Sequence, residues 1–169
     1  VDQTGEITLE DTIVEEDMVV TISHTGYIKR TAASLYRSQR RGGKGSAGMK
    51  PKEEDWVEHV FVGTTHNYIL FFTNRGKVYR QKVYELPEMQ RTAKGRALVN
   101  LLPLRDGERV QAVIATRDFK EAKYLAFATK KGQVKKTEFI DYNTPIKADG
   151  IIAINIKDDD ELVAVRLTD

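Results

Sequence analysis

The chain has 169 residues, 40% of them hydrophobic, with no cysteine and three scattered histidines, so a buried core is possible while a disulfide framework and a cysteine-ligated zinc site are excluded. The formal net charge is only +2, but residues 1–17 carry seven acidic and no basic residues, whereas residues 18–52 carry eight basic and no acidic ones. No apolar run approaches the roughly 18 residues of a membrane helix, and the acidic start does not resemble a signal peptide; we therefore expect a protein of the reducing cytoplasm without a membrane partner.

Short segments rich in Val, Ile, Phe and Thr follow one another along the chain, and no helical period is present, which predicts an all-β protein. We expect strands at 18–23, 60–64, 68–73, 110–116, 124–129, 151–156 and 162–167. Turns that end at Gly26, Gly76 and Gly132 predict three-residue hairpin loops with a left-handed glycine. After Gly76, polar and apolar residues alternate so that neither face of the expected strand is marked as the exposed one.

The three hairpin glycines mark an internal repeat. They lie 50 and 56 residues apart, and a large apolar or aromatic residue follows each by ten positions. A second set of glycines, Gly45, Gly95 and Gly150, is followed fifteen residues later by a valine each time. A period of about 50 residues with about four strands per unit is typical of propeller-like arrays.

One segment of the first repeat differs in composition from its counterparts. Residues 36–46 combine three glycines and two serines with a run of Arg and Lys, and such a segment offers both backbone N–H groups and positive charge to phosphates. It is not a nucleotide-binding P-loop, because Lys44 is followed by Gly45 where that motif requires Ser or Thr. Considered alone, the segment is also compatible with an ordinary solvated loop.

The sequence of Gln39–Gly45, Gln-Arg-Arg-Gly-Gly-Lys-Gly, resembles the GyrA box, the signature of the C-terminal domain of the DNA gyrase A subunit. Segments along the rest of the chain resemble the same domain at successive repeats and in the same order: 27–31, 71–79, 99–104, 128–132 and 165–169. The resemblance covers essentially the whole chain from residue 7 onward.

This resemblance implies a β-pinwheel, a propeller-like ring of four-stranded blades that exchange strands between neighbours. It also implies a domain that bends duplex DNA around a basic rim and gives the parent enzyme its negative supercoiling. The implied partners are DNA, the remaining parts of the gyrase A subunit, and the gyrase B subunit, in the bacterial cytoplasm at the nucleoid. The parent would use ATP and Mg in other domains, and no cofactor is expected in this one.

We divide the chain into an acidic lead-in, residues 1–17, and a partial β-pinwheel DNA-binding domain, residues 18–169. About three repeats are visible, the last of them incomplete, so we interpret the chain as the front portion of the family domain. We expect the strand at 162–167 to fold back onto the preceding sheet or to pair with a second copy, rather than to fray, because it can bury several apolar side chains.

The candidate DNA-binding residues form two groups. The first is the box itself: Gln39, Arg40, Arg41, Gly42, Gly43, Lys44 and Gly45. The second consists of basic residues that recur beside the hairpins and could follow a rim: Lys29, Arg30, Arg37, Arg75, Lys77, Arg80, Lys130, Lys131, Lys135 and Lys136. Distributed phosphate contacts of this kind are needed to offset the cost of bending DNA.

Other residues give no sign of catalysis. No triad, carboxylate pair or metal-ligand cluster emerges, and the acidic run 158–161 is interpreted as a turn. Trp56 is expected to anchor the core at the start of a strand, and Tyr36 is the one tyrosine expected to contact DNA. Two alternatives remain: the C-terminal domain of the topoisomerase IV A subunit, and a propeller-type module that binds proteins.

Overall fold

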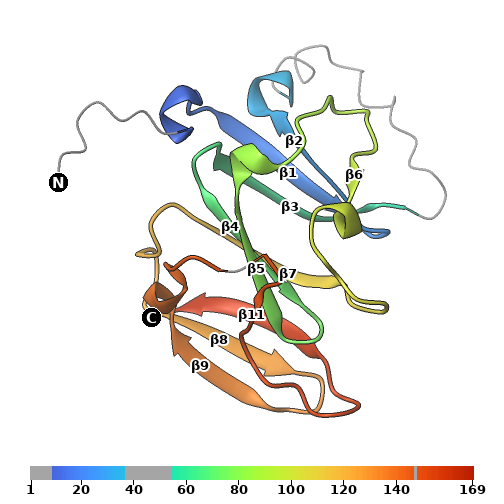
Figure 1. Cartoon of the computed structure of the whole chain (residues 1–169), viewed down its shortest axis with the longest axis vertical. Coiled ribbons are helices and arrows are strands. Elements are labelled where there is room, and N and C mark those ends of the chain that lie inside the picture. The colour runs from blue at the N-terminus through green and yellow to red at the C-terminus, as the bar shows by residue number, and fades with distance from the viewer. Residues whose placement is uncertain (1–8, 37–54, 147) are drawn as a thin grey trace.

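The computed structural model describes residues 9–36, 55–146 and 148–169, which form three antiparallel sheets that follow one another along the molecule (Figure 1). The strands are β1 (Asp17–Ser23), β2 (Tyr27–Ala32), β3 (Val57–Thr64), β4 (Tyr68–Thr73), β5 (Lys77–Lys82), β6 (Arg96–Ala97), β7 (Val110–Thr116), β8 (Tyr124–Thr129), β9 (Val134–Glu138), β10 (Ile151–Ile152) and β11 (Leu162–Thr168). Short 3-10 helices connect them: η1 (Glu10–Thr12), η3 (Val83–Glu85), η4 (Leu98–Asn100) and η5 (Phe139–Tyr142).

Each sheet is a blade built by the same connections. The strand orders are β3-β1-β2-β6 in blade 1, β10-β5-β4-β7 in blade 2 and β11-β8-β9 in blade 3. The first strand of each hairpin (β1, β4 or β8) pairs on its other side with β3, β7 or β11. In blades 1 and 2 the second strand of the hairpin, β2 or β5, also pairs with a short strand from the next repeat, β6 or β10. The expected all-β repeat with strand exchange between blades is therefore confirmed.

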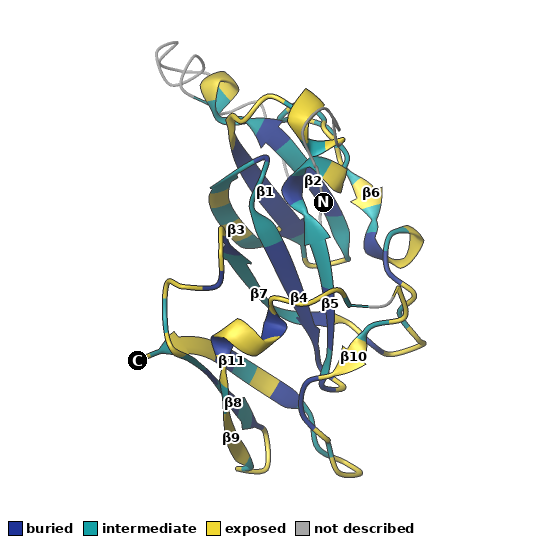
Figure 2. Ribbon diagram, turned by 60° about the vertical axis from the view of Figure 1, so that its left-hand side comes forward, coloured by how far each residue is buried: buried dark blue, intermediate teal, exposed yellow. Residues whose placement is uncertain are grey.

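The hydrophobic core fills the two spaces between the blades. One cluster joins blades 1 and 2 and includes Val20, Phe71 and Tyr79, and the other joins blades 2 and 3 and includes Phe72 and Phe127. Blade 2 is consequently covered on both faces, and β4 is buried along almost its whole length (Figure 2). This explains why alternation along β5 did not mark an exposed face, since adjacent Val78 and Tyr79 are both buried.

Three expectations about the strands need correction. The strand expected at 151–156 is confined to β10, after which Ala153 and Ile154 leave the sheet and enter the core. The strand expected from Val60 begins earlier, at Val57. Trp56 is not a core anchor, because it is 52% exposed and its indole stacks on the His24 ring at 4.0 Å between centroids.

The end of the chain folds back, which is one of the outcomes expected from the sequence. Strand β11 pairs with β8 from Leu162 to Thr168, so it takes the place in blade 3 that β3 and β7 take in blades 1 and 2. Leu162 and Val165 are buried between blades, whereas Val163 and Leu167 remain exposed.

The described part of the acidic lead-in packs on blade 2. The backbone carbonyls of Ile13 and Val14 accept hydrogen bonds from the His66 ring and the Thr65 hydroxyl at 2.8 and 2.7 Å. The Glu10 carboxylate lies 3.2 Å from the Lys82 ammonium. These contacts join the start of the chain to the second repeat before β1 enters the first blade.

Candidate nucleic-acid interface

The three hairpin tips are closed by the residues that precede β3, β7 and β11. The backbone N–H groups of His24, Asn74 and Lys130 donate to the carbonyls of Trp56, Arg109 and Glu161 at 2.7, 3.0 and 2.8 Å. The same bond therefore holds the same turn in each repeat, two residues before the hairpin glycine.

An acidic residue one position earlier completes this closure in each repeat. Asp55 accepts the N–H and hydroxyl of Thr25, Glu108 accepts the hydroxyl of Thr73 at 2.7 Å, and Asp160 accepts the N–H of Lys131 at 2.8 Å. Burial raises the pKa of Asp55 and of Asp160, but hydrogen bonds to each carboxylate outweigh this and hold the net pKa below its usual value. The run 158–161 is thus confirmed as a turn between strands, and one of its carboxylates holds the neighbouring hairpin.

These lowered pKa values predict a pH dependence of stability. A carboxylate whose pKa is lower in the folded chain stabilises it above the unfolded pKa of about 3.9, and this contribution is lost as pH falls through the folded value. We expect Asp160→Asn to lower the urea midpoint of unfolding at pH 7. At pH 3 the midpoints of the variant and the wild type should lie closer together. A difference independent of pH would show that the charge of Asp160 does not stabilise the turn.

Basic residues four positions after the hairpin glycines connect neighbouring repeats. Arg30 Nε donates to the carbonyl of Leu86 at 2.8 Å, and Arg80 donates to the carbonyl of Tyr142 at 3.4 Å. Leu86 and Tyr142 are the residues ten positions after the next hairpin glycine. Each arginine thus bonds the equivalent turn of the following repeat. In blade 3, Lys136 occupies this position and lies over the Tyr124 ring at 4.3 Å.

This arrangement changes the interpretation of the recurring charges. Arg30 also lies 3.7 Å from the Glu88 carboxylate, and Arg80 lies 4.7 Å from the centroid of the Tyr68 ring. Both side chains are half-buried between repeats rather than projecting from a rim. Their recurrence with the repeat is explained by packing between blades, which uses the same contact each time.

We expect Arg80→Ala to lower the free energy of unfolding by about 1–3 kcal/mol, since a charge-assisted bond and a cation–π contact are both lost. Lys136→Ala is the matched control at the equivalent position of blade 3 and should cost below about 1 kcal/mol. Urea titration of both variants checks this, and equal losses would contradict a role for Arg80 between repeats.

Lys29 was expected on the rim, and the structure corrects this. It is 7% exposed, and its ammonium donates to the carbonyls of Gln90, Arg91 and Ala93, the last at 2.6 Å. Burial, with a further contribution from the nearby Arg91 charge, lowers the pKa of Lys29. The hydrogen-bonding capacity of the Lys29 ammonium is therefore used by the loop of the second repeat.

The remaining cations of the rim group are more accessible. Arg75, Lys130 and Lys131 lie exposed in the hairpin loops, and Lys77 is half-buried. Arg75 donates to the carbonyl of Asp106 at 2.9 Å, and exposed Lys135 donates to that of Ala153 at 2.8 Å. The box, Gln39–Gly45, and Arg37 lie outside the described residues.

Sequence reasoning missed a further basic group in the second repeat. Arg91 and Lys94 lie just before β6, and Arg96 is its first residue. The guanidinium of Arg91 lies 4.5 Å from the Tyr36 ring centroid. Their signal was available in the spacing to Gly95, which marks the same point of the repeat as Gly45.

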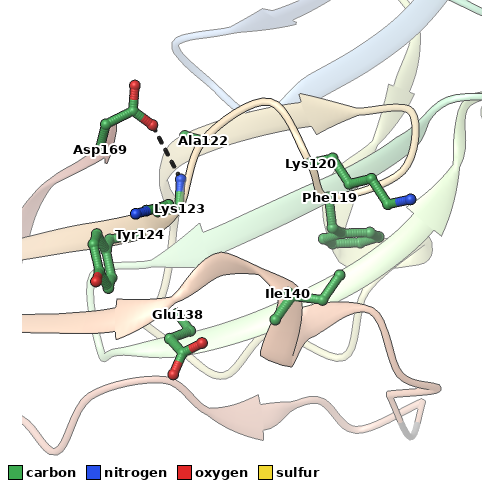
Figure 3. A pocket seen from close by; sticks show the side chains of 8 residues that line it. All are labelled: Phe119, Lys120, Ala122, Lys123, Tyr124, Glu138, Ile140 and Asp169. Atoms are coloured by element: carbon green, nitrogen blue, oxygen red, sulfur yellow. Dashed lines mark hydrogen bonds between the residues drawn. The ribbon is translucent and has the colours of Figure 1, made fainter.

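A hollow of about 450 Å³ lies at the end of blade 3 (Figure 3). Its lining mixes both charges with apolar groups: Phe119, Lys120, Ala122, Lys123, Tyr124, Glu138, Ile140 and Asp169. Two of these residues are joined by a hydrogen bond, because the Asp169 carboxylate accepts the N–H of Lys123 at 3.2 Å. Such a lining does not favour a polyanion.

Two further features are absent from residues 9–36, 55–146 and 148–169. They contain no helix of the length and apolarity that crossing a membrane requires. Nor do His, Asp and Glu side chains in this part of the chain gather in groups that could hold a metal ion.

Comparison with known families decides the relationship. The family model described as "DNA gyrase C-terminal domain, beta-propeller" matches residues 17–63, 67–117 and 123–169, which are the three repeats. The chain belongs to this family. The gyrase A subunits of Clostridium acetobutylicum and Streptomyces coelicolor are 52% and 49% identical to it over 97% and 96% of the chain. The chain spans about 20% of the length of these relatives.

Solved structures agree with this gyrase-domain fold. The C-terminal domain of DNA topoisomerase IV matches with a TM-score of 0.78 and 31% identity, over 93% of this chain and 47% of that one. A DNA gyrase A C-terminal domain matches with a TM-score of 0.62 and 24% identity, over 91% of this chain and 49% of that one, and supports the fold. The β-pinwheel expected from the sequence is confirmed.

Proposed function

We propose that the chain binds duplex DNA and bends it along a basic surface, and that it serves the supercoiling reaction of a gyrase in this way. The match of all three repeats to the DNA gyrase C-terminal domain model carries the proposal. Exposed cations on several repeats support it, since contacts spread along the duplex are needed to offset the energy of bending.

We restrict the proposed phosphate contacts to cations that are not held between repeats. Lys29 is buried, and Arg30 and Arg80 are half-buried with hydrogen bonds to the following repeat, so these three are left out of the interface. The proposed contacts are the box with Arg37, the exposed loop cations Arg75, Lys130 and Lys131, and three lysines on the strands β5 and β9 that follow the hairpin turns, Lys77, Lys135 and Lys136.

The chain has no proposed catalytic role. DNA cleavage and ATP use would belong to other parts of the gyrase A subunit, together with the gyrase B subunit. We propose these as its protein partners in the bacterial cytoplasm.

A salt series tests binding. The logarithm of the association constant for a 30-bp duplex should fall linearly with the logarithm of salt concentration, by about 0.9 for each phosphate contact. Two duplexes of unrelated sequence should give equal slopes, because phosphate contacts carry no sequence information. Absence of salt-dependent binding would instead favour a module that binds proteins.

The C-terminal domain of topoisomerase IV is the second candidate, favoured by the structural match at 31% identity. The intact Gln39–Gly45 sequence favours gyrase. To distinguish the two candidates, the chain can be fused to the cleavage core of a gyrase and, separately, to that of a topoisomerase IV, and the supercoiling of relaxed circles assayed. Only the gyrase assignment predicts negative supercoils.

A further inference from the structure

The second repeat carries a loop that corresponds to the box. Gly95 follows Gly76 by the same 19 residues that separate Gly45 from Gly26. With the glycines aligned, Arg91 corresponds to Arg41 and Lys94 to Lys44. The loop at 90–96, Gln-Arg-Thr-Ala-Lys-Gly-Arg, therefore keeps two of the three cations of the box at the same positions and adds Arg96.

Lys29 fixes the orientation of this loop. Its buried ammonium donates to three loop carbonyls, those of Gln90, Arg91 and Ala93. A single cation beneath the loop thus turns three peptide groups in one direction. Gln90 O also accepts the N–H of Ala93 at 3.0 Å, which closes the turn.

The outer side of the loop is suited to an anion. The C=O and N–H of a trans peptide point in opposite directions, and no cis peptide occurs among the described residues. The N–H groups of Arg91, Thr92 and Lys94 are therefore directed away from Lys29. Successive N–H groups that face outward form an anion-binding concavity.

Charged side chains surround these N–H groups. Lys94 and Arg96 are exposed, and Arg91 is half-exposed. Aromatic rings hold two of the side chains: the Lys94 ammonium lies 4.2 Å from the Tyr27 ring centroid, and the Arg91 guanidinium lies over Tyr36. Such contacts order the cations at the surface.

We propose that the loop at 90–96, positioned by Lys29, is a second phosphate-binding loop for duplex DNA. The inference rests on the proposed function and extends it by naming a site one repeat beyond the box. Arg91, Lys94 and Arg96 contact backbone phosphates, and Lys29 is a positioning residue that touches only the loop.

The corresponding loop of the third repeat has a different sequence. Asp149 stands immediately before Gly150, where Lys94 stands before Gly95. The position of Lys29 is taken in blade 2 by Tyr79, whose ring packs against Gly150. The third loop keeps the left-handed glycine of the repeat, at φ +79°, but Ile146 and Ile151 stand where the second repeat has Arg91 and Arg96.

The test compares two triple variants by DNA affinity across a salt series. The first is Arg91→Ala/Lys94→Ala/Arg96→Ala. The matched control, Lys120→Ala/Lys123→Ala/Lys157→Ala, removes the same charge from exposed positions on blade 3 and its following loop. Circular dichroism tests whether each variant is folded. If the loop triple variant does not fold, the single exposed substitution Lys94→Glu replaces it in the same test.

The loop variant should lose about tenfold or more in affinity at 0.1 M salt and reduce the salt slope by about two to three, while the control keeps the wild-type slope. Lys29→Met should lose affinity although every exposed charge of the loop is retained. Equal slopes for wild type and loop variant, or equal losses in loop and control variants, would overturn the inference alone. Salt-independent behaviour of the wild-type chain would overturn the proposed function with it.

Discussion

Gly76→Ala is expected to lower the free energy of unfolding by about 2–5 kcal/mol, the sum of left-handed backbone strain and overpacking. Gly76 has φ +87°, and a Cβ there would lie 2.3 Å from the carbonyl oxygen of Ile154 and 2.8 Å from Ile156 Cγ1. Those atoms belong to the segment that the third repeat passes to blade 2, whose Ala153 N–H donates to Gly76 O at 2.8 Å. Urea unfolding followed by circular dichroism measures the loss.

The matched control is Gly132→Ala. Gly132 occupies the same hairpin position with φ +97°, but the Cβ that alanine would add there has no atom within 4 Å among the described residues. It should therefore cost only the backbone strain, about 1–2 kcal/mol. Equal losses at the two glycines would show that the exchanged segment does not pack on the second hairpin as described.

The second large effect concerns the box. DNA circles that are ligated while wrapped on the chain should carry a positive topological shift. We expect this shift to be abolished in the box variant Arg40→Ala/Arg41→Ala/Lys44→Ala. Three clustered phosphate contacts are lost, and without them the bent path is no longer stabilised. The unfolding midpoint should stay near that of wild type.

Lys120→Ala/Lys123→Ala/Lys157→Ala serves again as the charge-matched control and should retain the shift. A box variant that shifts circles as wild type does would exclude the box from wrapping. If both triple variants lose the shift equally, the shift depends on the total positive charge of the chain and not on the box.

The repeat and its hairpins could be predicted because the determining residues are local. Gly26, Gly76 and Gly132 each require a left-handed turn between two strongly apolar strands, and that pattern lies within about a dozen residues. The exchange of strands between blades was not predictable from local sequence, because β6 and β10 have two residues each and are fixed by pairing with β2 and β5. The sequence predicted no strand at β6, and it predicted β10 only as the start of a longer strand.

The candidate site was harder to predict because charge alone does not show where a side chain points. Arg80 and Lys130 are both basic residues beside hairpins, but one bonds the next repeat and the other lies in solvent. Trp56 lies immediately before β3, but its side chain is exposed and stacks on His24 instead of entering the core. The role of Lys29 depends on a loop 61 residues away in sequence.

The bending of DNA by this chain is the central claim, and ring closure of a linear duplex tests it most directly. A fragment of about 150 bp, near the persistence length, closes slowly because its ends rarely meet. Saturating amounts of the chain are predicted to raise the ligation rate into circles severalfold, and the box variant to remove most of that increase. A rate unchanged or lowered while the duplex is fully bound would contradict bending and reduce the chain to a simple DNA-binding module.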